Sequence, residues 1–543
     1  MKNIITYNRF IVIGILLGVW QPLFCQKDTS KLAFNQVEVV KAFEVKLKEV
    51  KRITINPTIE ITSNIPIKYK YNITSVPANI KYPEPEIRAL AMQPDDPIHY
   101  YNGFVKGGYG TMRSPHLEAG YHKVRKELFS WGAHAKYVAV DDKDSILNQK
   151  MSNIHLNVQG NYVWKNNVQL SGSFENNFKN RRLWNEFESP DSLVEDRNIN
   201  KVGLTFGLHN IDLSKYKLNY AANVGFKSTR INDQNSFEQI IFVDGQVEKH
   251  RTDRLAFVLN AKMEVQVLKS EDWTSLFNLI TSPYFILRFG NFKSILGVSA
   301  ILSNDKNAIF PKIDLSYPIY KKHVQIFVGS DQKVFSNNLY QLSDINPFLN
   351  TNLNRLTNTI SKEIYGGLKG EYSFLSYQAN FGVKTVRGQS YFNFDSLDVA
   401  RFRLEYDDTK IVFFSGNLDF KIHKNVSLGG WLTQNTFRMD TLARPWHLPE
   451  LITHFYAKSS FFEDKLKLNL AFTFNDRIDF STSTDSISTS EYLFDVQASV
   501  EYFPLHNVGI YIKGNNLLNN NFQRWYGYRN LGIQVAGGIM IKF

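Results

Sequence analysis

Three histidines are the residues that come closest to a chemical motif in this sequence. His116, His122 and His134 follow one another closely, and on a β-strand His116 and His122 share a face. Their spacing matches neither H-E-x-x-H nor another zinc pattern, and no cysteine or carboxylate motif accompanies them. We interpret them as histidines at an interface or in the interior, the lumen, of the β-barrel that is predicted below. The sequence therefore predicts no metal site.

Other catalytic signatures are absent from the sequence. It contains no G-x-S-x-G, no Walker loop and no G-x-G-x-x-G that opens a helix. The stretch GGYG, residues 107–110, is typical of small residues in a crowded strand. A Ser-His pair in a barrel wall is the one enzymatic arrangement that these motifs do not address. We predict that the protein is not an enzyme and has no cofactor.

Charge and cysteine content argue against two classes of function, nucleic-acid binding and chemistry at a cysteine. The net charge is +12, but the lysines are spread along the chain, and no basic tract indicates nucleic acid. Cys25 is the single cysteine, so a chain cleaved after it has neither disulfide nor thiolate.

The first 25 residues have the pattern of a secretory signal. Lys2 and Arg9 precede the apolar run 10–20, and cleavage is expected before Gln26. A lipoprotein signal through Cys25 is the alternative, but Phe24 is bulky where such signals carry a small residue.

The elements that would position any functional residue are strands. Alternation of apolar and polar residues recurs after residue 100, as in the stretches 411–422, 464–477, 492–502 and 532–543. These stretches are longer than strands of soluble sheets, and no helical segment is available to cover their apolar faces, so we expect lipid to cover them. The sequence therefore predicts an all-β fold, a transmembrane antiparallel β-barrel over residues 101–543 with about 22 strands, within a range of about 18 to 24.

The connections between strands indicate how the barrel is oriented. Short polar turns alternate with long polar stretches, which are residues 180–198, 335–354, 438–450 and 477–491. This asymmetry is typical of outer-membrane barrels, and an even strand number places both barrel ends on the periplasmic side. The count is weakest over residues 272–291, and residues 231–250 are an alternative long hairpin loop.

The alternation also assigns candidate functional residues. We expect a lumen-facing polar set made up of Asp419, Lys421, Lys465, Lys467, Asp495 and Glu501. We expect a closing strand with Ile539, Ile541 and Phe543 toward lipid, because an unpaired strand edge in lipid is costly. The terminal aromatic also resembles the signal read by the outer-membrane barrel assembly machinery.

Residues 26–100 form a segment punctuated by Pro57, Pro66, Pro77, Pro83 and Pro85. Three interpretations stay open: a periplasmic linker, a minimal plug whose lysines neutralise acidic lumen residues, and a partner-docking arm. In the third, Val37, Glu38, Val39 and Val40 add to the sheet edge of a periplasmic protein, as a TonB box does.

Both ends of the predicted barrel resemble a known family. Residues 510–543, with an Asn-Leu loop containing Trp and Tyr and a final strand ending in Phe, resemble the end of TonB-dependent receptor barrels. Residues 100–123 resemble the first hairpin of receptor-like barrels. The resemblance implies an outer-membrane solute conduit or transporter. Residues 26–100 are too few for the usual plug and lack its glycine and arginine segments, so the alternative is a non-transporting component of an envelope complex.

Overall fold

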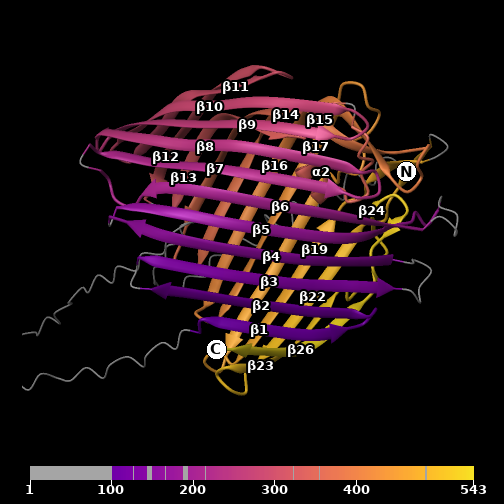
Figure 1. Cartoon of the computed structure of the whole chain (residues 1–543). Coiled ribbons are helices and arrows are strands. Elements are labelled where there is room, and N and C mark those ends of the chain that lie inside the picture. Colours follow the sequence, from indigo (N-terminus) through magenta and orange to yellow (C-terminus); the bar gives the residue numbers. More distant parts are fainter. Residues whose placement is uncertain are drawn as a thin grey trace, which may run out of the picture. The chain divides into compact units, whose positions relative to one another are not determined.

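The protein folds into a closed antiparallel β-barrel of 22 strands (Figure 1). The computed structural model describes residues 101–125, 128–142, 149–165, 167–187, 194–214, 216–321, 323–353, 355–482 and 486–543. The predicted signal (1–25) and the segment 26–100, with its docking strand Val37–Val40, lie outside the described residues and stay predictions. The predicted fold class and strand number are confirmed.

The barrel strands follow one another in sequence order. Their bounds are β1 (Gly103–Gly110), β2 (Ser114–Arg125), β3 (Phe129–Asp142), β4 (Gln149–Trp164), β5 (Val168–Leu183), β6 (Glu195–Asn210), β7 (Leu218–Ile231), β8 (Ser236–Thr252), β9 (Leu255–Lys269), β10 (Trp273–Phe289), β11 (Phe292–Ser303), β12 (Ala308–Tyr320), β13 (Val324–Ser336), β14 (Asn358–Glu371), β15 (Leu375–Phe394), β16 (Phe402–His423), β17 (Val426–Met439), β18 (Leu451–Phe461), β19 (Leu466–Asn475), β22 (Leu493–Tyr502), β23 (Val508–Asn515) and β26 (Gln534–Lys542).

The remaining elements lie in the connections. They are the helix α2 (Leu339–Ile345), the hairpin β20 (Asp479–Ser481) and β21 (Ile487–Thr489), and the hairpin β24 (Gln523–Trp525) and β25 (Tyr528–Arg529). The sequence did not predict this helix. Asn338 stabilises its start as an N-cap, because its side chain accepts a hydrogen bond from the Gln341 amide. Within the described residues, no helix is long and apolar enough to cross a membrane.

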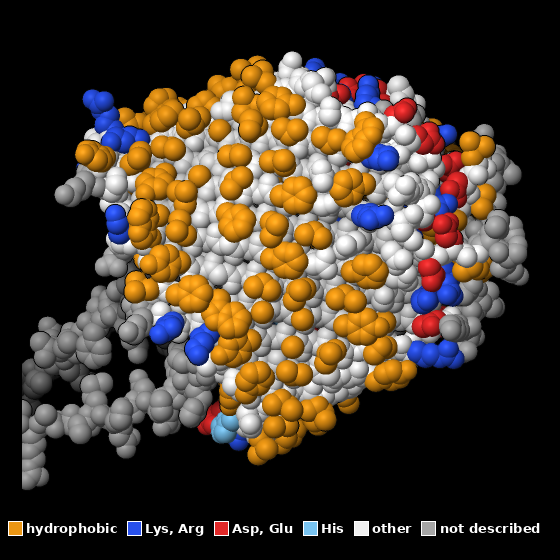
Figure 2. Space-filling view, viewed as in Figure 1, with side chains coloured by type: hydrophobic (Ala, Val, Ile, Leu, Met, Phe, Trp, Pro, Cys, Tyr) orange, Lys and Arg blue, Asp and Glu red, His pale blue; other side chains and the backbone are white. Residues whose placement is uncertain are grey.

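Alternation gives the barrel wall two different faces. In β15 and β16, Phe381, Phe414 and Val412 are exposed on one face, whereas Phe413 on the other face is buried. Figure 2 shows apolar side chains spread over the wall, with most of the charged side chains gathered at the end that carries α2 and β24. An exterior this apolar requires lipid as its surroundings.

The barrel closes where β26 pairs with β1. Ile539 lies opposite Gly107 and Ile541 opposite Val105, and backbone hydrogen bonds of 2.8 and 2.9 Å join Phe543 to Gly103. Tyr511 on β23 crosses this seam beneath Gly108, where a Cβ would lie 2.3 Å from the Tyr511 hydroxyl. The glycines of the GGYG stretch therefore permit the close approach that closure needs.

The structure assigns two stretches that the sequence left ambiguous, and it shortens one expected loop. Residues 231–250 are not a long loop, because a four-residue turn, 232–235, joins β7 to β8. The stretch 272–291 contains an ordinary strand, β10. The loop expected over 180–198 is shorter, because β5 continues to Leu183 and β6 begins at Glu195. The polar residues at these strand ends resemble loop residues in the sequence, but their backbones continue the hydrogen-bonded ladder.

We expect a charge on the apolar face to destabilise the barrel. Phe381 is 65% exposed and lies near the middle of its ladder, opposite Gly366. Phe381→Arg should lower the free energy of unfolding by about 2–4 kcal/mol, measured by urea titration in lipid vesicles. Asn380→Arg, on the opposite face, is the matched control and should cost less than about 1 kcal/mol. Equal effects of the two substitutions would contradict the assignment of faces.

Candidate functional site

The connections at one end of the barrel fold into a packed layer that we call the loop cap. It comprises residues 337–357, 395–401, 440–450, 476–492 and 516–533, with the described parts of each. These connections join successive strands at the end opposite to the one where β1 begins and β26 ends. Figure 1 shows α2 and β24 at this end.

An apolar core joins the loop cap to two sectors of the wall. Its wall residues are Ile199, Ile231, Leu268 and Leu276 from β6 to β10, and Phe392 and Phe402 from β15 and β16. Leu339, Leu342 and Leu349 come from the connection with α2, and Trp525 and Tyr528 from the β23–β26 connection. Phe348 stacks on Tyr528 with ring centroids 3.7 Å apart. The loop cap therefore bridges the mouth of the barrel.

A buried ionic cluster holds the loop cap to the wall. Asp233, in the β7–β8 turn, accepts hydrogen bonds from Arg197 Nε at 2.9 Å and from Arg401 Nη2 at 2.8 Å. The Arg197 and Asp233 side chains are fully buried. Burial alone would raise the pKa of Asp233, but the two arginines hold it below its ordinary value. Arg197 Nη1 also donates to the Pro347 and Leu349 carbonyls, at 3.0 and 2.6 Å.

Wall side chains also fix α2. The Leu339 and Tyr340 amides donate to Glu238, each at 2.8 Å. At the other end of the helix, Asp344 pairs with Lys179 and Lys201. Burial alone would raise the pKa of Asp344, but these lysines hold it below its ordinary value. The helix is thus held by charges of the barrel interior at both ends.

His447 lies at the centre of an aromatic cluster in the loop cap. Its Nδ1 is 2.7 Å from the Phe392 carbonyl, so that nitrogen carries the proton and donates. Its ring lies 4.8 Å from Trp525, 5.0 Å from Phe480 and 5.2 Å from Phe402, measured between centroids. Burial lowers the pKa of His447 to about 3, so the imidazole is neutral at physiological pH.

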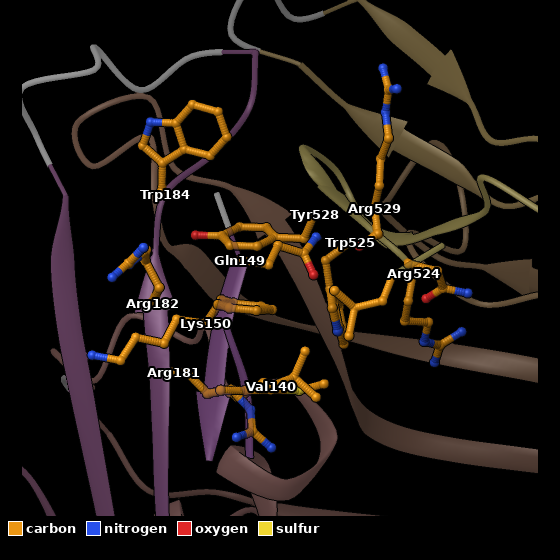
Figure 3. A pocket seen from close by; sticks show the side chains of 15 residues that line it. Val140, Gln149, Lys150, Arg181, Arg182, Trp184, Arg524, Trp525, Tyr528 and Arg529 are labelled. Atoms are coloured by element: carbon orange, nitrogen blue, oxygen red, sulfur yellow. Dashed lines mark hydrogen bonds between the residues drawn. The ribbon is translucent and has the colours of Figure 1, made fainter. Parts of the chain in front are cut away.

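A cavity of about 210 Å³ lies between the wall and the loop cap, and we call it the cationic pocket (Figure 3). Five of its lining side chains are basic: Lys150, Arg181, Arg182, Arg524 and Arg529. Its aromatic lining consists of Trp184, Phe348, Trp525 and Tyr528. Figure 3 shows Arg181, Arg182 and Lys150 on one side of the cavity, Arg524 on another, and Tyr528 and Trp525 between them. No acidic side chain lines this pocket among the described residues.

The predicted lumen residues lie on the face opposite to the exposed apolar one, with one exception. Asp419 accepts a hydrogen bond from the Tyr456 hydroxyl, which reaches it across Gly429. Glu501 pairs with Lys106 at 3.0 Å and lies opposite Lys467 in the ladder. Asp495 accepts from the Asn516 amide at 3.0 Å.

The lumen set does not form one site. Lys421 lies opposite Ser427 on β16 and β17, whereas β17, β18 and β19 separate Asp419 from Asp495 and Glu501. Lys465 is the exception, because it precedes β19 and its carbonyl accepts from the Phe503 amide in a turn. A role of these six residues in solute passage stays a prediction.

Two of the three histidines come together, but not as metal ligands. His134 Nε2 is 2.9 Å and His116 Nε2 3.5 Å from the same carboxylate, Glu118, and His116 Nδ1 is 3.2 Å from the Tyr511 hydroxyl. No group of metal-ligating side chains is present within the described residues.

The residues that build the loop cap were not found by sequence reasoning. Arg197, Asp233, Arg401 and His447 occur in stretches that read as strand ends or polar loops. The partial signal was composition: the connections that contain Arg401, Trp446 and Trp525 mix charged and aromatic residues more than solvated loops need.

Comparison with known proteins identifies the fold. No family model and no curated protein matches the chain. Among solved structures, the FrpB iron transporter from Neisseria meningitidis superposes with a TM-score of 0.64 at 10% identity, covering 82% of each chain. The siderophore receptor PirA from Acinetobacter baumannii gives 0.63 at 10% identity, covering 81% of this chain and 80% of that one. A mutant of the ferric enterobactin receptor PfeA from Pseudomonas aeruginosa gives 0.62 at 10% identity, with the same coverage. The predicted resemblance to the TonB-dependent receptor barrel is confirmed for the fold.

We expect the ionic cluster to control the stability of the loop cap. Asp233→Asn leaves the buried Arg197 guanidinium without its carboxylate, which costs about 3–5 kcal/mol, whereas Arg401 keeps Glu195 and Asp398. Amide hydrogen exchange over residues 345–352 should speed up at least about a hundredfold. Asp398→Asn, whose carboxylate is 27% exposed, is the control and should change exchange little. Unchanged protection in Asp233→Asn would show that the apolar core alone holds the cap.

We expect acid to open the loop cap through His447. Its folded pKa of about 3 lies below the ordinary 6.5, so its contribution to stability is complete above pH 6.5 and is lost as the pH falls toward 3. Acrylamide quenching of tryptophan fluorescence should therefore increase across that interval. His447→Gln, which can still donate to Phe392, should flatten the profile, whereas His506→Gln in an exposed turn should leave it unchanged. A profile unaffected by His447→Gln would exclude this histidine as the titrating group.

Proposed function

We propose that the protein is a solute conduit of the outer membrane whose loop-bearing end is closed by the loop cap. The observation that carries the proposal is the packing of the cap: its apolar core reaches wall strands from β6 to β16 across the barrel mouth. A barrel whose only task is to anchor an arm gains nothing from a charged interior and a cap held by buried ion pairs.

The lumen supports this proposal through its chemistry. Ion pairs such as Lys106 with Glu501 and Lys312 with Asp331 line the inner wall, at 3.0 and 2.9 Å. An interior of this kind is wetted by water and suits a polar solute. The similar solved structures are named an iron transporter and siderophore receptors, which favours transport over catalysis, and we propose that the chain is not an enzyme.

The proposed orientation places the loop cap outside the cell and both barrel ends in the periplasm, as long outer loops and short inner turns indicate. The proposed partners are outer-membrane lipid around the wall, the barrel assembly machinery during biogenesis, and a periplasmic protein, TonB-like or part of an envelope complex, for residues 26–100. In this arrangement the cap is where solute arrives.

The proposal predicts the conductance of the purified protein in planar bilayers. Four forms test it: the full chain, the chain without residues 26–100, the chain with a short Gly-Ser linker in place of residues 338–356, and the chain with both changes. The full chain should be closed, and the form with both changes should conduct, because it lacks α2 and any plug.

The single changes locate the barrier. Conductance after loss of residues 26–100 alone would identify that segment as the plug, whereas conductance after the linker replacement alone would assign closure to the cap. If the form with both changes stays closed, the conduit proposal fails, and capture of a periplasmic partner by residues 26–100 becomes the explanation for the barrel.

A further inference from the structure

Three of the five basic side chains of the cationic pocket pair with carboxylates in the described part of the chain. Asp196 pairs with Lys150 at 3.1 Å and with Arg182 at 3.4 Å, and Glu186 pairs with Arg529 at 2.9 Å. Arg181 and Arg524 have no carboxylate partner among the described residues.

These two arginines retain free donors. Arg181 uses Nη1 on the Ser152 and Asn180 carbonyls, at 3.1 and 2.7 Å, and its Nε and Nη2 have no partner in the described part of the chain. Arg524 has no hydrogen bond there, and its guanidinium lies 5.4 Å from the centroid of the Trp525 ring. Burial lowers the pKa of Arg524, which measures the cost of holding this charge away from water.

A guanidinium held in this way is satisfied best by an oxyanion. Its planar fork matches the two oxygens of a phosphate or carboxylate, and such charge-assisted bonds are about twice as strong as neutral ones. Trp184 also lines the pocket, and its buried Nε1 has no partner among the described residues. Within the described chain, nothing on the protein supplies the missing acceptors.

Four aromatic side chains form another part of the lining. Trp525 and Tyr528 are 5% and 8% exposed, and the stack of Phe348 on Tyr528 gives that side of the cavity a rigid aromatic surface. Aromatic faces of this kind bind planar groups by stacking. A bare ion would leave this surface unused.

The position of the pocket favours a dissolved ligand over a lipid headgroup. Val140, Met151 and Arg181 lie opposite one another in the ladder, on the inner face of β3, β4 and β5. Across the cavity lie Pro347 and Phe348 of the loop cap. The pocket thus lies between the inner wall and the cap.

We infer that the cationic pocket binds an oxyanion, a phosphate or carboxylate carried by a small molecule with a flat apolar part, through Arg181 and Arg524. The inference rests on the proposed function, in which the loop cap is where solute arrives, and it names the class of that solute. The pocket then becomes the first binding station of the conduit.

Binding of phenyl phosphate tests the inference. Isothermal titration of the full chain in detergent should show saturable binding, with inorganic phosphate at least about tenfold weaker because it cannot stack. Arg181→Gln combined with Arg524→Gln should weaken phenyl phosphate at least about tenfold. Arg524→Lys keeps the charge but loses the planar fork, so its affinity for phenyl phosphate should lie between those of the wild type and the double variant. Arg403→Gln, at an exposed arginine paired with Glu405, is the matched control and should bind as the wild type does.

Three outcomes would overturn the inference. These are no saturable binding by the wild type, equal losses in Arg403→Gln and the double variant, or displacement of phenyl phosphate by anionic lipid vesicles, which would assign the site to a headgroup. Unfolding of the double variant is detected by its urea titration, and Arg524→Lys then carries the test.

Binding does not depend on conduction, so the two proposals fail separately. Saturable binding by a barrel that stays closed in every form would keep the pocket and remove the conduit. A conducting barrel that ignores phenyl phosphate would keep the conduit and remove this class of solute.

Discussion

The structure depends on one constraint, which is that every backbone amide and carbonyl surrounded by lipid must find its partner within the protein. The pairing of β26 with β1 satisfies this constraint by removing the last free edge. Its cost is crowding at the seam, where Tyr511 leaves no room for a side chain at Gly108. Once the ring is closed, apolar side chains are exposed outside, and polar ones are gathered inside, where they form ion pairs such as that of Lys106 with Glu501.

Polar residues of that interior stabilise the loop cap. Asp233, Glu238 and Lys201 are wall residues or lie at wall turns, and each holds part of the cap by charge-assisted hydrogen bonds. The same enclosure explains the cationic pocket, because Arg524 is held away from water there and pairs with no carboxylate among the described residues. Within the described residues, fully paired carboxylates and arginines without a carboxylate partner thus occur at the same end of the barrel.

The sequence predicted the barrel well because alternation is a local signal, repeated in each strand. It predicted the closing strand for the same reason, and it misplaced Lys465 because one residue separates a strand from its turn. The ionic cluster left no such trace, since Asp233 lies 36 residues from Arg197 and 168 from Arg401. Helix α2 escaped notice because seven residues in an Asn-rich stretch carry too little periodicity, and its stability comes from Glu238 and the lysines around it.

The stack of Phe348 on Tyr528 has a consequence for the order of biogenesis. Phe348 precedes β14, whereas Tyr528 lies just before the closing strand, so the two rings meet only after nearly all of the wall has been synthesised and inserted. Until then the inner face at Ile199 and Leu276 lacks its cover, and such exposed apolar surface attracts chaperones. Completion of the cap thus distinguishes a finished barrel from an unfinished one.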